Sequence, residues 1–184
     1  AVRRGLVHAA GLDCEAASPP APEAPRYVGF WDADLATPLE DIPEFADVLD
    51  DHPAVDLVMG ARVNLLGRHV KRNLLRHYIG RVFATAAAAV LRLSVYDTQC
   101  GAKLLRVTPE LPSVVCTPFV SRWIFDVELL ARYLSLPGSR SVTPGERFYE
   151  YPLERWTDVA GSKLKPIDFL TVGVDLWRIH FRYP

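Results

Sequence analysis

Two carboxylates, Asp32 and Asp34, directly follow a short apolar run at residues 27–31. The run predicts a buried strand, so both carboxylates are expected at its carboxyl end. Oxygen ligands one residue apart can share one hard cation, Mg²⁺ or Mn²⁺, and leave positions open for substrate phosphates. Such an ion would neutralise the diphosphate leaving group of a nucleotide sugar. The alternative is a solvated turn with a helix-capping aspartate, because an isolated D-x-D pattern is common by chance.

A second polar segment is Gly161-Ser162-Lys163, which follows Arg155, Trp156 and Asp158. Glycine lets a backbone approach a phosphate closely, a serine hydroxyl donates a hydrogen bond, and lysine supplies a compact charge. The segment therefore suits phosphate binding. Considered alone, it is better explained as a loop with a helix beginning at Ser162.

Further carboxylates lie in a loop and a helix. Asp97 heads the polar loop 97–103, where it can lie near a sugar acceptor or simply form an Asx-type turn. Asp126 and Glu128 fall within a predicted helix over 122–134. Residues two apart on a helix point to different faces, so at most one of the two can face a site. A solvated helix face explains either of them equally well.

The cationic residues are concentrated in one segment. No acidic residue occurs between Leu57 and Tyr96, although the net charge of the whole chain is −1. The bases in that segment are Arg62, Arg68, Lys71, Arg72, Arg76, Arg81 and Arg92. Apolar residues recur every four positions over 68–93, which predicts a long helix with Arg68, Arg72 and Arg76 in one stripe. This helix suits an anionic membrane surface. A core helix with a basic solvent face is the alternative, and nucleic acid is less favoured because basic and aromatic residues do not alternate.

The remaining pattern alternates strands with helices and predicts an α/β sheet. Thr37, Pro38 and Glu40 form a helix-capping signature, and Gly60 is expected to close the next strand. Chemistry in such sheets gathers at the carboxyl ends of the strands. The predicted elements are a helix over 1–11, strands at 27–31 and 55–59, a strand near Leu104, a strand over 148–156, and a last helix over 166–181.

Length and composition suggest one domain of 184 residues with ordinary hydrophobic content, 49%. Cys14, Cys100 and Cys116 are predicted to be reduced thiols of a cytosolic protein, and none has metal-ligand spacing. No run of about 18 apolar residues predicts a membrane span. The chain begins without Met inside a predicted helix, so we expect the natural N-terminus to lie elsewhere.

Several motifs in this order resemble one family. They are FWDADLATP, MGAR, a basic helix, DTQCGAKLLR, RWIFDVELL, ERWTDVAGSKL and a helix ending in DLWRIHFRY. The pattern is similar to that of dolichyl-phosphate β-glucosyltransferases and related polyprenyl-phosphate glycosyltransferases of family 2. The resemblance covers nearly the whole chain. It implies a GT-A fold, Rossmann-like with a mixed central sheet, and inverting transfer of a sugar from a nucleotide donor to polyprenyl or dolichyl phosphate at the cytoplasmic membrane face.

The resemblance also assigns roles to individual residues. Asp32 and Asp34 would hold Mg²⁺ or Mn²⁺ and the diphosphate, with Asp34 also counted as catalytic. Arg62 would lie near a donor or acceptor phosphate, and Asp97 would be catalytic in the acceptor-side loop. Arg155, Ser162 and Lys163 would hold phosphates.

Two departures from the family pattern refine the assignment. Mannosyltransferase relatives have a glutamine where this chain has Ala36, which favours the glucosyl branch and UDP-glucose. The family's N-terminal nucleotide-binding motifs do not occur here. The chain is therefore expected to be the C-terminal two-thirds of a GT-A domain, with loops at 14–26 and 136–146 that are longer than usual. The alternatives are a family 2 enzyme with another glycolipid or saccharide acceptor, an inactive phosphate-binding domain, and an unrelated phosphate-binding module.

Overall fold

The computed structural model describes residues 1–16, 18–71, 74–137, 144–157 and 166–183. Its centre is a four-stranded sheet in the order β1 (Tyr27–Trp31), β4 (Ala102–Arg106), β2 (Leu57–Ala61) and β5 (Phe148–Pro152). Strand β4 runs antiparallel to both β1 and β2, whereas β2 and β5 are parallel. The sheet is therefore mixed, and with helices on both faces it agrees with the GT-A-like arrangement predicted from the sequence.

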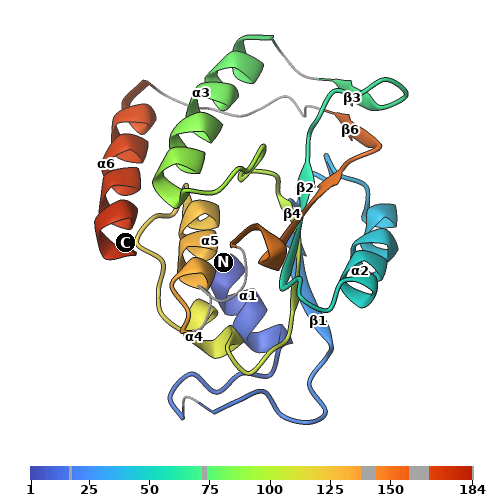
Figure 1. The fold of residues 1–184 in the computed structure, drawn as a ribbon, viewed down its shortest axis with the longest axis vertical. Helices are drawn as coiled ribbons and strands as arrows, with labels where there is room; N and C mark the ends of the chain where they lie inside the picture. The colour runs from blue at the N-terminus through green and yellow to red at the C-terminus, as the bar shows by residue number, and fades with distance from the viewer. Residues whose placement is uncertain (17, 72–73, 138–143, 158–165, 184) are drawn as a thin grey trace.

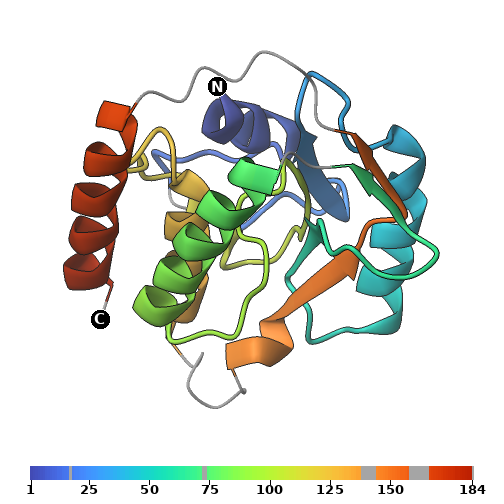
Figure 2. The same ribbon diagram turned by 90° about the horizontal axis from the view of Figure 1, so that it is seen from above.

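The helices form unequal layers on the two faces of the sheet. Figure 1 shows α2 (Ile42–Asp51) alone on one face and α1 (Val2–Ala9), α4 (Leu111–Val115) and α5 (Phe125–Leu134) on the other. Helices α3 (Leu74–Leu91) and α6 (Pro166–Arg182) lie outside that second layer, as the view from above in Figure 2 also shows. Each face has its own apolar core, the smaller one built around Phe45 and Leu49 of α2.

The strand directions bring several chain segments to one edge of the sheet. Because β4 is antiparallel to its neighbours, the carboxyl ends of β1, β2 and β5 lie at the same edge as the beginning of β4. A second sheet, β3 (His69–Lys71) with β6 (Arg155–Thr157), is parallel and continues from β2 and β5 beyond that edge. This edge is where Asp32, Arg62 and the loop before β4 meet.

The predicted helix over 68–93 is wrong in its first part. Residues His69–Lys71 form strand β3, and α3 begins only at Leu74. The backbone N–H of His69 donates to the carbonyl of Glu154 at 2.9 Å, and Arg68 forms an ion pair with Glu154 at 2.7 Å. The four-residue apolar period could not reveal this, because the strand is fixed by its partner far along the chain. Arg68 therefore lies outside the helix and cannot form one helical stripe with Arg76, and Arg72 lies outside the described residues.

The predicted capping signature at Thr37 is also wrong. A 3-10 turn (Leu39–Asp41) precedes α2, which begins at Ile42. Thr37 is buried, with its hydroxyl 4.0 Å from the thiol of Cys100. The Thr37 side chain packs in the interior and therefore does not cap the helix.

Two strand limits differ from the prediction as well. Strand β2 continues through Gly60 to Ala61, and Gly60 is required there because a Cβ would lie 2.9 Å from Cys100 Sγ. The predicted strand over 148–156 divides into β5 and β6, which belong to different sheets. Leu153 and a bend at Glu154 separate them, and each half pairs with a different neighbour.

The cysteines do not all stay reduced as predicted. Cys14 and Cys116 form a disulfide across a sequence separation of 102 residues, while Cys100 is a buried free thiol. The bridge ties the segment after α1 to the end of α4, which closes a long loop and restricts the unfolded chain. A stable disulfide is typical of oxidising compartments, so the cysteines no longer support the predicted cytosolic location.

Candidate functional site at the sheet edge

Asp32 and Asp34 lie in a tight turn at the carboxyl end of β1. The backbone N–H of Asp32 donates to the carbonyl of Gly101 at 2.9 Å, extending the β1–β4 pairing by one step. Asp34 Oδ1 accepts a hydrogen bond from the backbone N–H of Ala36 at 3.0 Å. Both aspartates are solvent-exposed. The bond to Ala36 uses only one of the two oxygens of the Asp34 carboxylate. Asp34 can therefore form the local turn and still offer its other oxygen to a ligand.

The carboxylate of Asp32 rests directly on Gly101. A Cβ at position 101 would overlap the carboxylate atoms of Asp32, so only glycine permits this close approach. Asp32 keeps access to solvent, but its carboxylate is partly desolvated where it packs on the backbone at Gly101. This desolvation, together with the nearby charge of Asp34, raises the pKa of Asp32, and Lys103 and Arg62 partly oppose the shift. Gly101 of the DTQCGAK segment thus provides the space that the Asp32 carboxylate occupies.

Asp97 and Arg62 form a bidentate ion pair. Arg62 Nε donates to Asp97 Oδ2 at 2.6 Å, and Arg62 Nη2 donates to Oδ1 at 2.7 Å. The two side chains are only 16% and 7% exposed. Burial alone would lower the pKa of Arg62, but the hydrogen bonds and charge of Asp97 outweigh it and raise that pKa. Asp97 therefore orients a cation, and the Asx-type alternative also holds because its Oδ1 accepts from Gln99 N at 3.2 Å.

Trp156 provides a flat surface for the Arg62 guanidinium. The carbon at the centre of that group lies 5.2 Å from the Trp156 ring centroid, a cation–π distance. Trp156 belongs to β6, so the contact joins the end of β2 to the second sheet. Arg62 is thereby fixed from two sides.

Glu150 is a site residue that the sequence analysis missed. From β5, its carboxylate accepts hydrogen bonds from the backbone N–H groups of Tyr96, at 2.9 Å, and of Asp97, at 2.8 Å. It therefore holds the loop that carries Asp97. The only sequence signal was an acidic residue inside an aromatic strand, and its partners lie more than 50 residues away.

Asp126 and Glu128 are both buried, so the alternative of a solvated helix face is wrong for each of them. Asp126 pairs with Lys103 at 2.6 Å, and burial raises the pKa of Asp126 against the opposing effect of Lys103. Lys103 also donates to the carbonyls of Thr98 and Cys100, at 3.0 and 2.6 Å. The Lys103–Asp126 pair therefore stabilises the 97–103 loop from the protein interior.

Glu128 has a purely structural setting away from this edge. It pairs with Arg132 at 2.7 Å. Arg132 in turn donates to the backbone carbonyls of Val114, Thr117 and Pro118. This network joins α5 to the end of α4 and to the chain that follows it.

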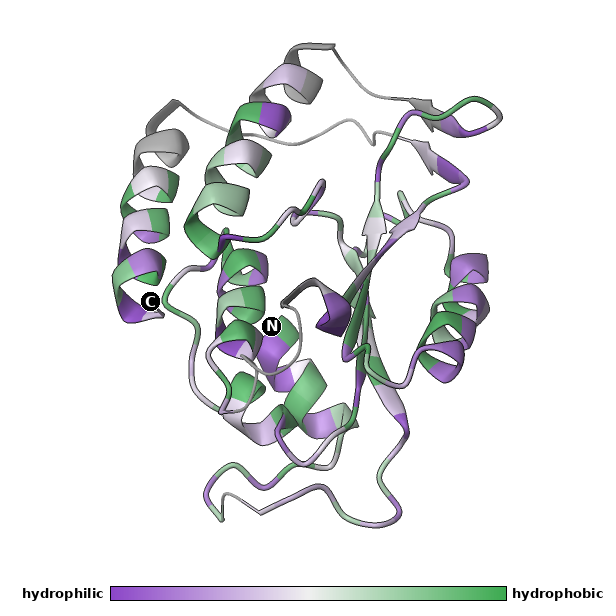
Figure 3. Ribbon diagram, in the orientation of Figure 1, coloured by the Kyte–Doolittle hydropathy of each residue, from purple (hydrophilic) through white to green (hydrophobic). Residues whose placement is uncertain are grey.

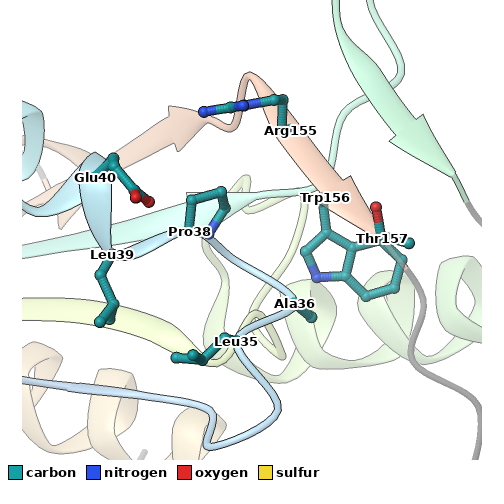
Figure 4. A pocket seen from close by; sticks show the side chains of 8 residues that line it. All are labelled: Leu35, Ala36, Pro38, Leu39, Glu40, Arg155, Trp156 and Thr157. Atoms are coloured by element: carbon teal, nitrogen blue, oxygen red, sulfur yellow. The ribbon is translucent and has the colours of Figure 1, made fainter.

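A pocket of about 460 Å³ opens beside the D-x-D turn (Figure 4). One wall comes from the residues after Asp34, and the other comes from β6. Its lining is Leu35, Ala36, Pro38, Leu39, Glu40, Arg155, Trp156 and Thr157. Arg155 thus lines this pocket. Ser162 and Lys163 lie outside the described residues.

Comparison with known proteins supports the resemblance. No protein-family model matches the chain. A dolichyl-phosphate beta-glucosyltransferase of Drosophila melanogaster is 34% identical over 199 residues, covering 100% of this chain and 51% of the relative. Relatives of the same name from Dictyostelium discoideum and Homo sapiens are each 31% identical, over 86% and 83% of this chain and 47% and 46% of their own length. The chain spans about half the length of the curated relatives it matches.

The buried ion pair gives a stability prediction. Replacing Asp97 with Ala should lower the free energy of unfolding by about 3–5 kcal/mol, because Arg62 would be left charged and largely desolvated. Urea unfolding measures the change. The double variant Arg62→Met with Asp97→Ala should recover part of the loss.

Asp50→Ala is the matched control, since it removes the exposed Arg26–Asp50 pair and should change stability little. An Asp97→Ala protein as stable as the control would show that the Arg62–Asp97 pair does not contribute as described.

Proposed function

Because the chain belongs, over the half that it spans, to the dolichyl-phosphate β-glucosyltransferase family, we propose that it carries the metal- and phosphate-binding edge of an inverting glycosyltransferase. The donor is a nucleotide sugar, with UDP-glucose the first choice, and the acceptor is dolichyl or polyprenyl phosphate. The observation that carries the proposal is the position of the D-x-D turn. It lies at the same sheet edge as Arg62, a buried cation held in place by Asp97.

In the proposed reaction, an oxygen of the acceptor phosphate attacks the anomeric carbon. The bond from that carbon to the nucleotide diphosphate breaks on the opposite face, and the electron pair leaves with the diphosphate. Arg62 would bind and orient one of the two phosphates, and Arg155 and Lys163 would add positive charge. Asp97 would keep Arg62 oriented.

The residues present suit a divalent cation. Asp32 and Asp34 supply hard oxygen ligands at an exposed strand end, and Gly101 leaves room for the first carboxylate. Across the described residues, no larger group of His, Cys, Asp or Glu could hold a metal ion by itself. Two protein carboxylates leave most positions to water and phosphates, as Mg²⁺ prefers. When bound, Mg²⁺ or Mn²⁺ would neutralise the diphosphate leaving group.

The outer helices suit a membrane surface. Within the described part of the chain, no helix is both long and apolar enough to cross a bilayer. Helix α3 nevertheless exposes Tyr78 and Val82, and α6 exposes Val174, Trp177 and Phe181. Figure 3 shows hydrophobic and hydrophilic segments alternating along both helices. The two helices pack against each other. We propose that this α3–α6 surface, in place of a single helix over 68–93, rests on the membrane that holds the acceptor. The cytoplasmic face remains a prediction.

Sugar transfer tests the function directly. With UDP-glucose, Mn²⁺ and a polyprenyl phosphate, the complete protein should form a polyprenyl phosphoglucose. Asp34→Ala should reduce kcat/KM more than Asp97→Asn, because the first removes a metal ligand and the second leaves a hydrogen-bonding side chain beside Arg62. Radiolabelled transfer measures both, and the opposite ranking would contradict the assigned roles.

Metal binding gives a second test of the same edge. Gly101→Ala should weaken Mn²⁺ binding by about tenfold or more, since the new methyl group must displace the Asp32 carboxylate. Calorimetric titration with Mn²⁺ measures this effect. Gly5→Ala is the matched control, because nothing lies within 4 Å of a Cβ there. Equal affinity in both variants would remove Asp32 from the metal site.

Membrane binding gives a third prediction. Replacing both Trp177 and Phe181 with Ser should weaken co-sedimentation with anionic liposomes by about tenfold or more, because two large apolar side chains leave the bilayer. Leu66→Ser is the control, since Leu66 is fully exposed on the turn before β3 and outside the α3–α6 surface. Unchanged co-sedimentation of the double variant would exclude this surface.

A further inference from the structure

Arg81 belongs to the cationic segment that suits an anionic surface, but its side chain is engaged with the protein itself. From α3, Arg81 Nη1 donates to the backbone carbonyl of Tyr96 at 3.0 Å. The central carbon of its guanidinium also lies 4.0 Å from the centroid of the Tyr96 ring, a close cation–π distance. Both contacts join the outer helix α3 to the residue that directly precedes Asp97.

The peptide unit between Tyr96 and Asp97 is held at both ends by charged side chains. Its carbonyl accepts from Arg81 at 3.0 Å, and its N–H donates to Glu150 Oε1 at 2.8 Å. Hydrogen bonds with an ionised partner are shorter and stronger than those between neutral groups. Rotation of this peptide plane would break both bonds. The two charged residues therefore fix the direction in which the Asp97 side chain leaves the backbone.

The chain that ends α3 leads back to the same loop. Arg92 has a φ of +51°, and the N–H of Leu93 donates to the carbonyl of Ala88 at 3.1 Å, which is the Schellman arrangement of a helix end. Figure 1 shows the chain after α3 turning back toward the sheet edge. Tyr96 is thus connected to α3 through the chain itself and through Arg81.

We propose that Arg81 is a positioning residue of the site, which fixes the Tyr96–Asp97 peptide and thereby orients the Arg62 guanidinium. The inference rests on the proposed function for the phosphate that Arg62 would bind. The effect of Arg81 is transmitted by the Asp97 carboxylate, which accepts from Nε and Nη2 of Arg62 at 2.6 and 2.7 Å. Loss of Arg81 should therefore matter for catalysis only while Arg62 is present.

A double-variant cycle on sugar transfer tests this dependence in the complete protein. Arg81→Met keeps an apolar stem but removes the donor and the charge, so it should lower kcat/KM by about tenfold. In an Arg62→Met background, the same change should lower kcat/KM by less than about twofold. Equal losses in both backgrounds would overturn the proposal, because a residue that only supports the fold acts regardless of Arg62.

Two further variants complete the cycle. Arg81→Lys should recover part of the loss, since an ammonium group can still donate to the Tyr96 carbonyl. The lysine variant also serves if Arg81→Met unfolds in a thermal melt. Arg26→Met is the matched control, because Arg26 likewise forms an ion pair and lies 5.1 Å from a tyrosine ring centroid, that of Tyr27, but precedes β1 at its other end. It should leave kcat/KM within about twofold of wild type.

An NMR measurement follows Arg62 without any sugar transfer. The Nε–H of Arg62 gives a ¹⁵N-correlated signal, which Arg62→Met identifies by its loss. Because this N–H donates to Asp97 at 2.6 Å, it should exchange slowly with water in wild type. In Arg81→Met the exchange should be at least about tenfold faster, since the pair opens more often. Unchanged exchange would overturn the proposal.

The two measurements separate this inference from the function that it extends. If sugar transfer fails but the Arg62 signal responds to Arg81→Met and not to Arg26→Met, the positioning of Arg62 by Arg81 stands and the transferase assignment falls. If transfer succeeds and Arg81→Met behaves like Arg26→Met in both measurements, the positioning role is overturned and the function stands.

Discussion

The architecture of the site depends on the ion pair between Arg62 and Asp97. Arg62 follows β2, and Asp97 begins the loop that leads into β4, so the pair connects two neighbouring strands at their shared edge. Glu150 of β5 fixes the other side of that loop through the backbone of Tyr96 and Asp97. Three strands of the sheet therefore contribute to the position of one guanidinium. A mobile surface arginine would lose conformational entropy on binding a phosphate, whereas Arg62 is already ordered.

A second charged pair supports the same loop from the interior. Lys103 and Asp126 are almost fully buried, and such a pair often contributes little net stability because both charges must leave water. Its value here is geometric. Lys103 joins the carbonyls of Thr98 and Cys100, which hold Gly101 under Asp32. Three residues of the DTQCGAK motif therefore act together. Asp97 orients Arg62, Gly101 leaves space for the Asp32 carboxylate, and Lys103 holds the loop by hydrogen bonds to its carbonyls.

Local patterns predicted the elements that depend on local sequence. Strand β1 with its carboxylates, helix α6 and the α/β class all followed from apolar periodicity and turn residues, whereas the mixed sheet was implied by the resemblance. The failures have a common physical cause, which is a partner distant in sequence. Thr37 is buried against Cys100, and residues 69–71 pair with β6. Cys14 finds Cys116 across 102 residues. One sequence contains no signal for such pairings, and the roles of Arg62 and Asp97 could be assigned only by resemblance, without their mutual contact.

The state of Asp97 also agrees with the chemistry of the proposed acceptor. Both oxygens of the Asp97 carboxylate accept hydrogen bonds from the Arg62 guanidinium, so this side chain is occupied in holding Arg62. An alcohol acceptor would need a general base, and Asp97 could serve as one only by giving up this ion pair. A phosphate monoester has a second pKa of about 6 and is mostly dianionic at neutral pH, so it already carries the nucleophilic oxygen. The edge then has to supply positive charge and orientation more than proton transfer. Asp97 meets this requirement because it orients the Arg62 guanidinium.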